Sequence, residues 1–162
     1  MDVAILGAPS SIGLRPDDRT GQPQHVDRAP ATLRALGLME RLGATDLGDV
    51  APPAYRDFDR PPGRPRNEAE VAEYSRSLGE AFADGLDRQR FVVVLGGDCS
   101  IVLGCLLGAR RIGKRIGLAY VDAHADFATP GESQTGSVAS MALALAVGRG
   151  DSPLAQLDGA SP

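Results

Sequence analysis

The sequence predicts an α/β protein built around a parallel β-sheet. Short apolar segments at residues 3–6, 91–95 and 116–121 alternate with longer stretches whose apolar residues recur at helical spacing. The segment 91–95 is apolar throughout and contains three consecutive valines. Such a run is typical of a strand that is buried on both faces, as strands of parallel sheets are.

The first part of the chain contains a predicted strand, loop, helix and second strand. Apolar residues 3–6 end in a Gly-Ala-Pro turn, and the polar residues 10–28 predict a loop. Pro30 stands near the start of a stretch with leucines at helical spacing, which Gly43 closes. Residues 45–50 predict a second strand.

The rest of the chain repeats this alternation after a proline-rich loop at 52–66. Residues 68–86 predict an amphipathic helix, because Val71, Tyr74 and Leu78 share one face. The remaining predicted elements are a strand at 91–95, a helix at 101–112, a strand at 116–121, a helix at 137–147 and a loop over 149–162.

Composition excludes several classes of protein. The 162 residues are 43% hydrophobic and 23% charged, and this length is enough for one domain with a sizeable core. Lys and Arg number 17 against 21 Asp and Glu, so the net charge of −4 gives no basic face for nucleic acid. No apolar run approaches the roughly 20 residues that span a membrane. Two cysteines and the absence of a basic N-terminal region favour the cytoplasm.

The strongest chemical signal is Asp122-Ala-His124-Ala-Asp126, directly after the predicted strand at 116–121. Three metal-competent side chains at alternate positions point the same way if the segment stays extended. Carboxylates with an imidazole suit a divalent ion such as Mn²⁺ or Zn²⁺, and ligands of parallel sheets gather at the carboxyl ends of strands. A solvated polar turn explains the same spacing equally well.

A second signal is Gly96-Gly97-Asp98-Cys99-Ser100, after the strand at 91–95. The glycines allow a sharp turn, and a strand-to-helix turn with a buried thiol is the simplest interpretation. A nucleotide-binding loop lacks support, because neither a G-x-G-x-x-G nor a Walker pattern is present. A catalytic pair of Cys99 with His124 is conceivable but lacks any sign of an oxyanion hole.

Five segments together resemble one family, the ureohydrolases, which comprise arginase, agmatinase, formiminoglutamase and their relatives. In order they are Gly7-Ala-Pro-Ser-Ser-Ile-Gly, Ala29-Pro-Ala-Thr-Leu-Arg-Ala-Leu-Gly-Leu, Leu47-Gly-Asp-Val, Val94-Leu-Gly-Gly-Asp-Cys-Ser and Val121-Asp-Ala-His-Ala-Asp. The resemblance implies a three-layer α/β/α fold with a parallel sheet and a binuclear manganese centre. In that family a metal-bound hydroxide hydrolyses a C–N bond of a guanidino or amidino substrate, a small molecule.

The resemblance also implies residue roles at the metal centre. Asp122 matches the carboxylate that bridges the two ions, and His124 matches a ligand of the second ion. Asp126 matches a ligand of the first ion that also contacts the nucleophile, so it is the expected catalytic residue. Cys99 stands where the family has a histidine ligand of the first ion. A thiolate is softer and favours Zn²⁺ or Fe²⁺ over Mn²⁺, or the thiol binds no metal and leaves that site weak or empty.

The expected substrate loop departs from the family at two nearby positions. Ser133 and Thr135 match residues that hydrogen-bond the carboxylate end of the substrate. Ala128 replaces an asparagine that also serves this end, and Ala139 replaces a histidine that shuttles a proton to the leaving group. Loss of a general acid typically costs ~10²–10⁴-fold in rate. These departures favour a second hypothesis, a catalytically degenerate binding or regulatory protein.

The resemblance further implies that residues 1–162 are the N-terminal half of one arginase-like domain. Family members are about twice this length, with a sheet order similar to 2-1-3-8-7-4-5-6, and their second Asp-x-Asp metal motif has no counterpart in this sequence. We therefore expect a C-terminal half on a second polypeptide or a missing segment to complete the sheet. The family also implies a homo-oligomer, commonly a trimer or hexamer.

Overall fold

The computed structural model describes residues 2–87, 90–113 and 115–159, and its centre is a parallel three-stranded sheet. The strands are β1 (Val3–Ala8), β2 (Thr45–Asp49) and β3 (Phe91–Gly96). Their order is β2-β1-β3, with β1 hydrogen-bonded to both neighbours in parallel. This order agrees with the first three positions of the order that the resemblance implies, and the prediction of a parallel sheet is confirmed.

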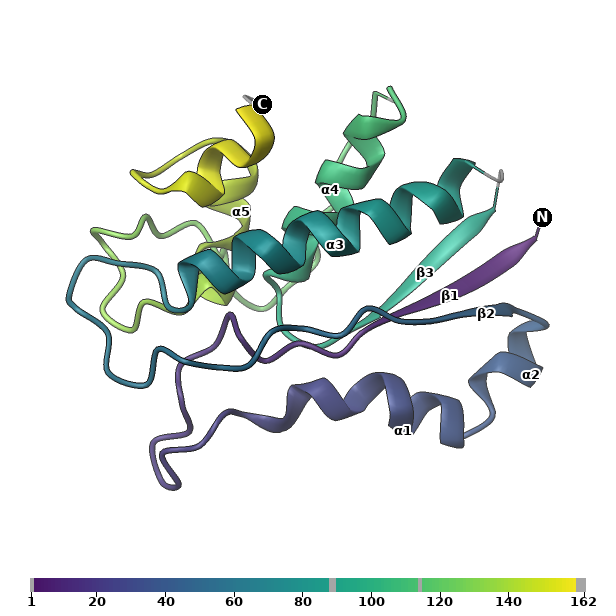
Figure 1. Cartoon of the computed structure of the whole chain (residues 1–162), viewed down its shortest axis with the longest axis horizontal. Coiled ribbons are helices and arrows are strands. Elements are labelled where there is room, and N and C mark those ends of the chain that lie inside the picture. Colours follow the sequence, from purple (N-terminus) through teal and green to yellow (C-terminus); the bar gives the residue numbers. More distant parts are fainter. Residues whose placement is uncertain (1, 88–89, 114, 160–162) are drawn as a thin grey trace.

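Helices lie on both sides of the sheet, which gives the expected three layers (Figure 1). The helices α3 (Glu68–Asp87) and α4 (Ile101–Arg111) lie on one side. The shorter helices α1 (Ala29–Ala35) and α2 (Leu38–Leu42) lie on the other. Among the described residues, no helix is both long enough and apolar enough to cross a membrane.

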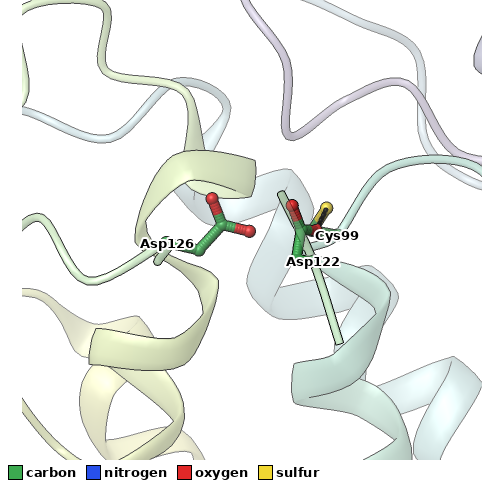
Figure 2. A group of neighbouring side chains, drawn as sticks. All are labelled: Cys99, Asp122 and Asp126. Atoms are coloured by element: carbon green, nitrogen blue, oxygen red, sulfur yellow. Dashed lines mark hydrogen bonds between the residues drawn. The ribbon is translucent and has the colours of Figure 1, made fainter. Parts of the chain in front are cut away.

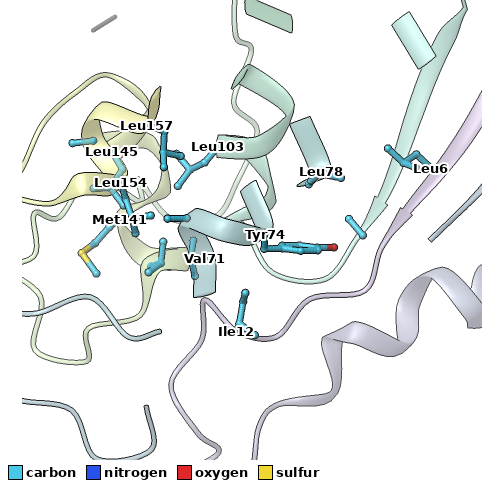
Figure 3. Close-up of a cluster of buried hydrophobic side chains, with 14 residues drawn as sticks. Leu6, Ile12, Val71, Tyr74, Leu78, Leu103, Met141, Leu145, Leu154 and Leu157 are labelled. Carbon is cyan, nitrogen blue, oxygen red and sulfur yellow. The ribbon is translucent and has the colours of Figure 1, made fainter. Parts of the chain in front are cut away.

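The main hydrophobic core lies between the sheet, α3 and the C-terminal part of the chain (Figure 3). Tyr74 is only 2% exposed, and its hydroxyl donates to the carbonyl of Val50 at 2.9 Å. A buried phenol hydroxyl without a hydrogen-bond partner would destabilise the fold, and this bond supplies that partner for Tyr74. The other buried side chains of this core are apolar: Leu6, Ala8, Ile12, Val71, Ala72, Leu78, Leu103, Val138, Met141, Leu145, Leu154, Ala155 and Leu157.

Two expected elements are shorter or more broken than the sequence predicts. The helix expected at 30–42 is divided into α1 and α2, because Gly37 adopts a left-handed conformation with φ of 79°. The helix expected at 137–147 begins as a 3₁₀ turn (Val138–Met141) and continues as α5 (Ala142–Ala146). Leucine spacing alone does not detect such breaks. The apolar face expected over 33–42 is also not buried, because Leu33, Leu36 and Leu42 are 37%, 68% and 46% exposed.

The predicted strand at 116–121 is wrong. Residues 115–122 have no regular structure, and Ile116, Leu118 and Val121 are 47%, 44% and 97% exposed. A β-strand needs a neighbour to accept and donate its backbone hydrogen bonds. Within the described part of the chain, β1 is flanked by β2 and β3, and no strand pairs with residues 116–121. The apolar composition predicted a strand, but its partner is not among these residues.

The predicted loop over 149–162 is also wrong for its described part. Residues Pro153–Gly159 form 3₁₀ turns, and Leu154 and Leu157 enter the main core. Two ion pairs anchor the end of this segment, because Asp158 contacts Arg76 of α3 at 2.8 Å and Arg111 of α4 at 2.9 Å. Residues 160–162 lie outside the described residues.

Helices α3 and α4 touch backbone to backbone where glycines face each other. A Cβ added to Gly108 would lie 2.4 Å from the carbonyl oxygen of Gly79. A Cβ added to Gly104 would lie 3.0 Å from the carbonyl oxygen of Ser75. The helices therefore approach more closely than any side chain at these positions would allow.

We predict that Gly108→Ala destabilises the chain, although Gly→Ala inside a helix normally stabilises by ~1 kcal/mol. The added methyl group collides with a backbone atom, so we expect a loss of about 1–3 kcal/mol in the free energy of unfolding. Urea unfolding followed by circular dichroism measures this. Gly131→Ala is the control, because no heavy atom lies within 4 Å of its added Cβ. Equal stability of the two variants would contradict the close helix contact.

Candidate metal centre

The turns that follow β1 and β3 pack against each other at the carboxyl end of the sheet. The backbone N–H of Asp98 donates to the carbonyl of Ser10 at 3.0 Å. A Cβ on Gly97 would lie 1.8 Å from that same carbonyl oxygen, so only glycine permits this approach. The contact fixes the turn that carries Cys99.

The buried carboxylate of Asp98 connects the same two turns through hydrogen bonds. It is 4% exposed and accepts hydrogen bonds from Ser10 Oγ at 3.1 Å, the Gly13 N–H at 3.1 Å and the Ser100 N–H at 2.9 Å. Burial raises the pKa of Asp98, and these hydrogen bonds oppose the increase. A buried carboxylate is tolerated when its oxygens find such donors. Asp98 therefore positions Cys99 without facing the site itself.

Cys99, Asp122 and Asp126 come together beside this turn. One ligand atom from each lies within 4.8 Å of the others, and Cys99 Sγ is 3.8 Å from Asp122 Oδ2 (Figure 2). Two ligands of one tetrahedral ion, a sulfur and an oxygen, stand about 3.6 Å apart. The donor set and its spacing therefore fit a divalent metal ion.

Asp126 is the most firmly held of the three residues. Its backbone has a φ of 46°, and its carbonyl accepts from the N–H groups of Leu143 and Ala144 at 3.0 and 3.2 Å. The hydroxyl of Tyr120 donates to its Oδ2 at 2.5 Å, and the residue is 8% exposed. Tyr120 was not predicted as a site residue. Its position two residues before Asp122 is the only indication in the sequence that it lies near the site.

His124 does not join this group. Its side chain is 84% exposed, with Nδ1 3.5 Å from Asp122 Oδ1. The backbone N–H of His124 donates to Asp122 Oδ1 at 2.9 Å, and this bond lowers the pKa of Asp122. The segment bends at residues 123–124 and turns left-handed at Asp126, so it does not stay extended. Alternate positions therefore do not present all three side chains in one direction.

The protein environment disfavours a free thiolate at Cys99. Burial raises the pKa of Cys99 to about 11, and the carboxylates of Asp126 and Asp122 add to the increase. Two carboxylates beside a thiol make the group rich in electron donors. A divalent cation would offset this accumulation of negative charge.

Ser133 and Thr135 lie in a separate loop that arginines of the proline-rich segment hold in place. Arg60 donates to the carbonyls of Ser133 at 3.3 Å and Thr135 at 3.1 Å, and Arg66 donates to Thr135 at 2.9 Å. Ser133 Oγ accepts from the Gly136 N–H at 3.0 Å, and Thr135 Oγ1 accepts from the Ser137 N–H at 3.2 Å. Each hydroxyl oxygen acts as an acceptor in these bonds, so its own O–H can still donate a hydrogen bond to a ligand. Neither Arg60 nor Arg66 could be predicted from a local pattern, since their partners are some 70 residues away.

Ala128 and Ala139 are part of the packed interior rather than of an open site. Ala139 is 6% exposed, and its N–H donates to the carbonyl of Gly13 at 3.0 Å. Ala128 is half-buried and packs against the main core. The two positions that depart from the ureohydrolase pattern thus carry small side chains in close contact with their surroundings.

Comparison with known proteins places this architecture in a family. A sequence profile described as "Arginase family" matches residues 1–154. The chain belongs to the arginase family. It is 36% identical to an arginase from Bacillus caldovelox over 99% of this chain and 53% of that protein, and 32% identical to one from Staphylococcus aureus over 96% and 52%. The chain therefore spans about half the length of the curated relatives it matches.

Solved arginase structures share this fold. The structure of the arginase from Bacillus caldovelox superposes with a TM-score of 0.85 at 34% identity, covering 99% of this chain and 54% of that one. An arginase from Entamoeba histolytica in complex with L-ornithine superposes with a TM-score of 0.79 at 27% identity, covering 99% and 54%. These likenesses confirm the arginase-like α/β fold.

We predict that Asp98→Ala destabilises the chain by about 2–4 kcal/mol, because it leaves buried donors on both turns without an acceptor. Urea unfolding measures the loss. Asp151→Ala is the matched control, since Asp151 is exposed. A loss no larger than that of the control would show that Asp98 does not join the turns.

Proposed function

We propose that this chain supplies part of the active site of a metal-dependent hydrolase that cleaves a C–N bond in a guanidino or amidino substrate. The observation that carries the proposal is the group of Cys99, Asp122 and Asp126 at the carboxyl end of a parallel sheet in a chain of the arginase family. These residues would hold a divalent ion. When bound, such an ion polarises the substrate and lowers the pKa of water so that it attacks at neutral pH.

We propose that Asp126 is the catalytic carboxylate. Tyr120 occupies its Oδ2, so its Oδ1 would bind the ion and, through its second lone pair, accept a hydrogen bond from the attacking water molecule. Because its backbone is fixed through Leu143 and Ala144, that oxygen is held in place. Orientation of this kind is a large part of what an active site contributes.

We propose that Ser133 and Thr135 bind the far end of the substrate. Both hydroxyls accept backbone hydrogen bonds and can donate their protons to a carboxylate. The arginase from Entamoeba histolytica was solved with L-ornithine, which carries such a carboxylate. His124, exposed beside Asp122, would bind a second ion only after its side chain turns toward the group.

We further propose that a second polypeptide or segment completes the site. The curated arginases are about twice as long as this chain. Exposed apolar side chains mark β3 and the unpaired segment beyond α4, with Phe91 at 52%, Ile116 at 47% and Val121 at 97% exposure. Open apolar strand edges favour association with another strand. Additional metal ligands and a homo-oligomeric state would come with this completion.

The test is urea release from arginine and agmatine by the metal-loaded chain together with the polypeptide that co-purifies with it. We expect hydrolysis by the complex and a loss of at least ~10²-fold in Asp126→Asn, which removes the charged acceptor. Asp151→Asn is the control and should retain full activity. A complex that contains metal but turns over neither substrate would contradict the proposal.

Ala139 favours a second candidate function, a binding or regulatory protein. Its methyl group is buried where the family resemblance expects a proton-shuttling histidine, so no side chain at 139 serves a leaving group. Calorimetric titration with L-ornithine and arginine separates the two functions. Tight binding without turnover would support the regulatory protein, whereas turnover would eliminate it.

We predict that Val121→Lys weakens association of the chain with its completing polypeptide. The side chain is 97% exposed on the unpaired segment, and a buried lysine there would lose its hydration. Sedimentation velocity measures the fraction of complex. Leu36→Lys is the matched control, because Leu36 is 68% exposed at the end of α1. Equal association of both variants would exclude the segment around Val121 from the interface.

A further inference from the structure

We propose that Cys99 makes this centre selective for a thiophilic divalent ion, Zn²⁺ or Co²⁺, over Mn²⁺. The inference rests on the proposed function only in placing a metal ion among Cys99, Asp122 and Asp126. It adds the chemical class of that ion. The donor set and the contact between Tyr120 and Asp126 support it, and the donors lie close enough together for one ion.

The donor set contains one sulfur and two carboxylate oxygens. Manganese prefers carboxylate, imidazole and water, whereas thiolate ligands select zinc and other softer ions. The Sγ of Cys99 lies on the side of Asp122, 3.8 Å from its Oδ2, so an ion held by both carboxylates also meets the sulfur. The backbone that carries the thiol is held in this place by the turn that Asp98 fixes.

The donors lie close enough together for one ion, because all three donor atoms are within 4.8 Å of one another. Sites with a thiolate ligand are typically tetrahedral zinc sites, whereas Mn²⁺ belongs with the ions that take six oxygen-type ligands.

Tyr120 restricts the carboxylate of Asp126. Its hydroxyl donates to Oδ2 at 2.5 Å, which leaves Oδ1 as the free ligand atom and favours monodentate binding. Monodentate carboxylates keep the coordination number low. Tyr120 is thus a positioning residue, and partners of this kind typically change metal affinity by about 10–100-fold.

The first experiment titrates the reduced chain with Co²⁺ under nitrogen and records its absorption spectrum. A thiolate bound to Co²⁺ gives a near-ultraviolet charge-transfer band, which we expect in the unaltered chain and in Cys105→Ala. Cys105 is the matched control, because it is the other free cysteine and lies in α4 away from the carboxylates. The band should disappear in Cys99→Asp. Its absence from the unaltered chain, or its survival in Cys99→Asp, would overturn the proposal.

The second experiment compares Zn²⁺ and Mn²⁺ affinities by competition, since most protein sites bind Zn²⁺ more tightly than Mn²⁺ and only a change in their ratio is informative. We expect Cys99→Asp to reduce the ratio of Zn²⁺ to Mn²⁺ affinity at least tenfold or so, because it replaces sulfur by oxygen. Tyr120→Phe should weaken Zn²⁺ binding about 10–100-fold while keeping the cobalt–thiolate band. An unchanged ratio in Cys99→Asp would refute the role of the sulfur.

A third measurement needs no variant and covers the case in which Cys99→Asp fails to fold. Alkylation by iodoacetamide, mapped to Cys99 by mass spectrometry, should be blocked by Zn²⁺ and not by Mn²⁺. Equal protection by both ions, or by neither, would count against the proposal. The proposed hydrolase fails separately: a complex with the cobalt–thiolate band and no urea release contradicts the activity and leaves the metal preference intact.

Discussion

The buried carboxylate of Asp98 is the constraint on which the rest of the site depends. It accepts hydrogen bonds from the turn after β1 and from its own turn after β3, at a position that is 4% exposed. Position 13 also requires glycine, because an added Cβ would lie 2.3 Å from Asp98 Oδ1. The sheet ends are thereby joined by a polar contact inside the protein. The backbone of Cys99, the next residue, is positioned by this contact.

The sequence predicted those parts of the fold that depend on local pattern. The valines at 92–94 predict a strand, and they form β3 in parallel with β1. The expected burial on both faces is not met, because these valines are half-buried and Phe91 is 52% exposed. The same reasoning failed at 116–121, because a strand depends on its neighbour as well as on its own residues. Among the described residues no strand pairs with this segment, and its apolar side chains are exposed. Residues 153–159 show the opposite error, since Leu154 and Leu157 in a short polar context enter the core through contacts that no local pattern reveals.

The candidate site also contains residues that the sequence predicted and residues that it did not. Asp122 and Asp126 were expected as ligands from their spacing behind an apolar segment, and Cys99 from the resemblance to the ureohydrolases. The residues that hold the loop of Ser133 and Thr135 were not predicted. Arg60 and Arg66 reach carbonyls far along the chain from inside a proline-rich loop, where composition indicates only irregular structure. His124 was misplaced for a different reason, since the left-handed turn at Asp126 ends the extended geometry that the alternate spacing assumed.

The three candidate ligands differ in how firmly the protein holds them, and this difference governs the energetics of ion binding. The backbone of Cys99 is fixed through Asp98, and that of Asp126 is fixed through α5. Asp122 instead follows an unpaired, exposed segment and is held mainly by the backbone N–H of His124. Ordering the backbone of one residue costs roughly 1–2 kcal/mol of conformational entropy. An ion that binds Asp122 must therefore also order the segment that precedes Asp122 in the sequence. A strand paired with residues 116–121, as proposed above, would order that segment in advance and would therefore strengthen binding of the ion.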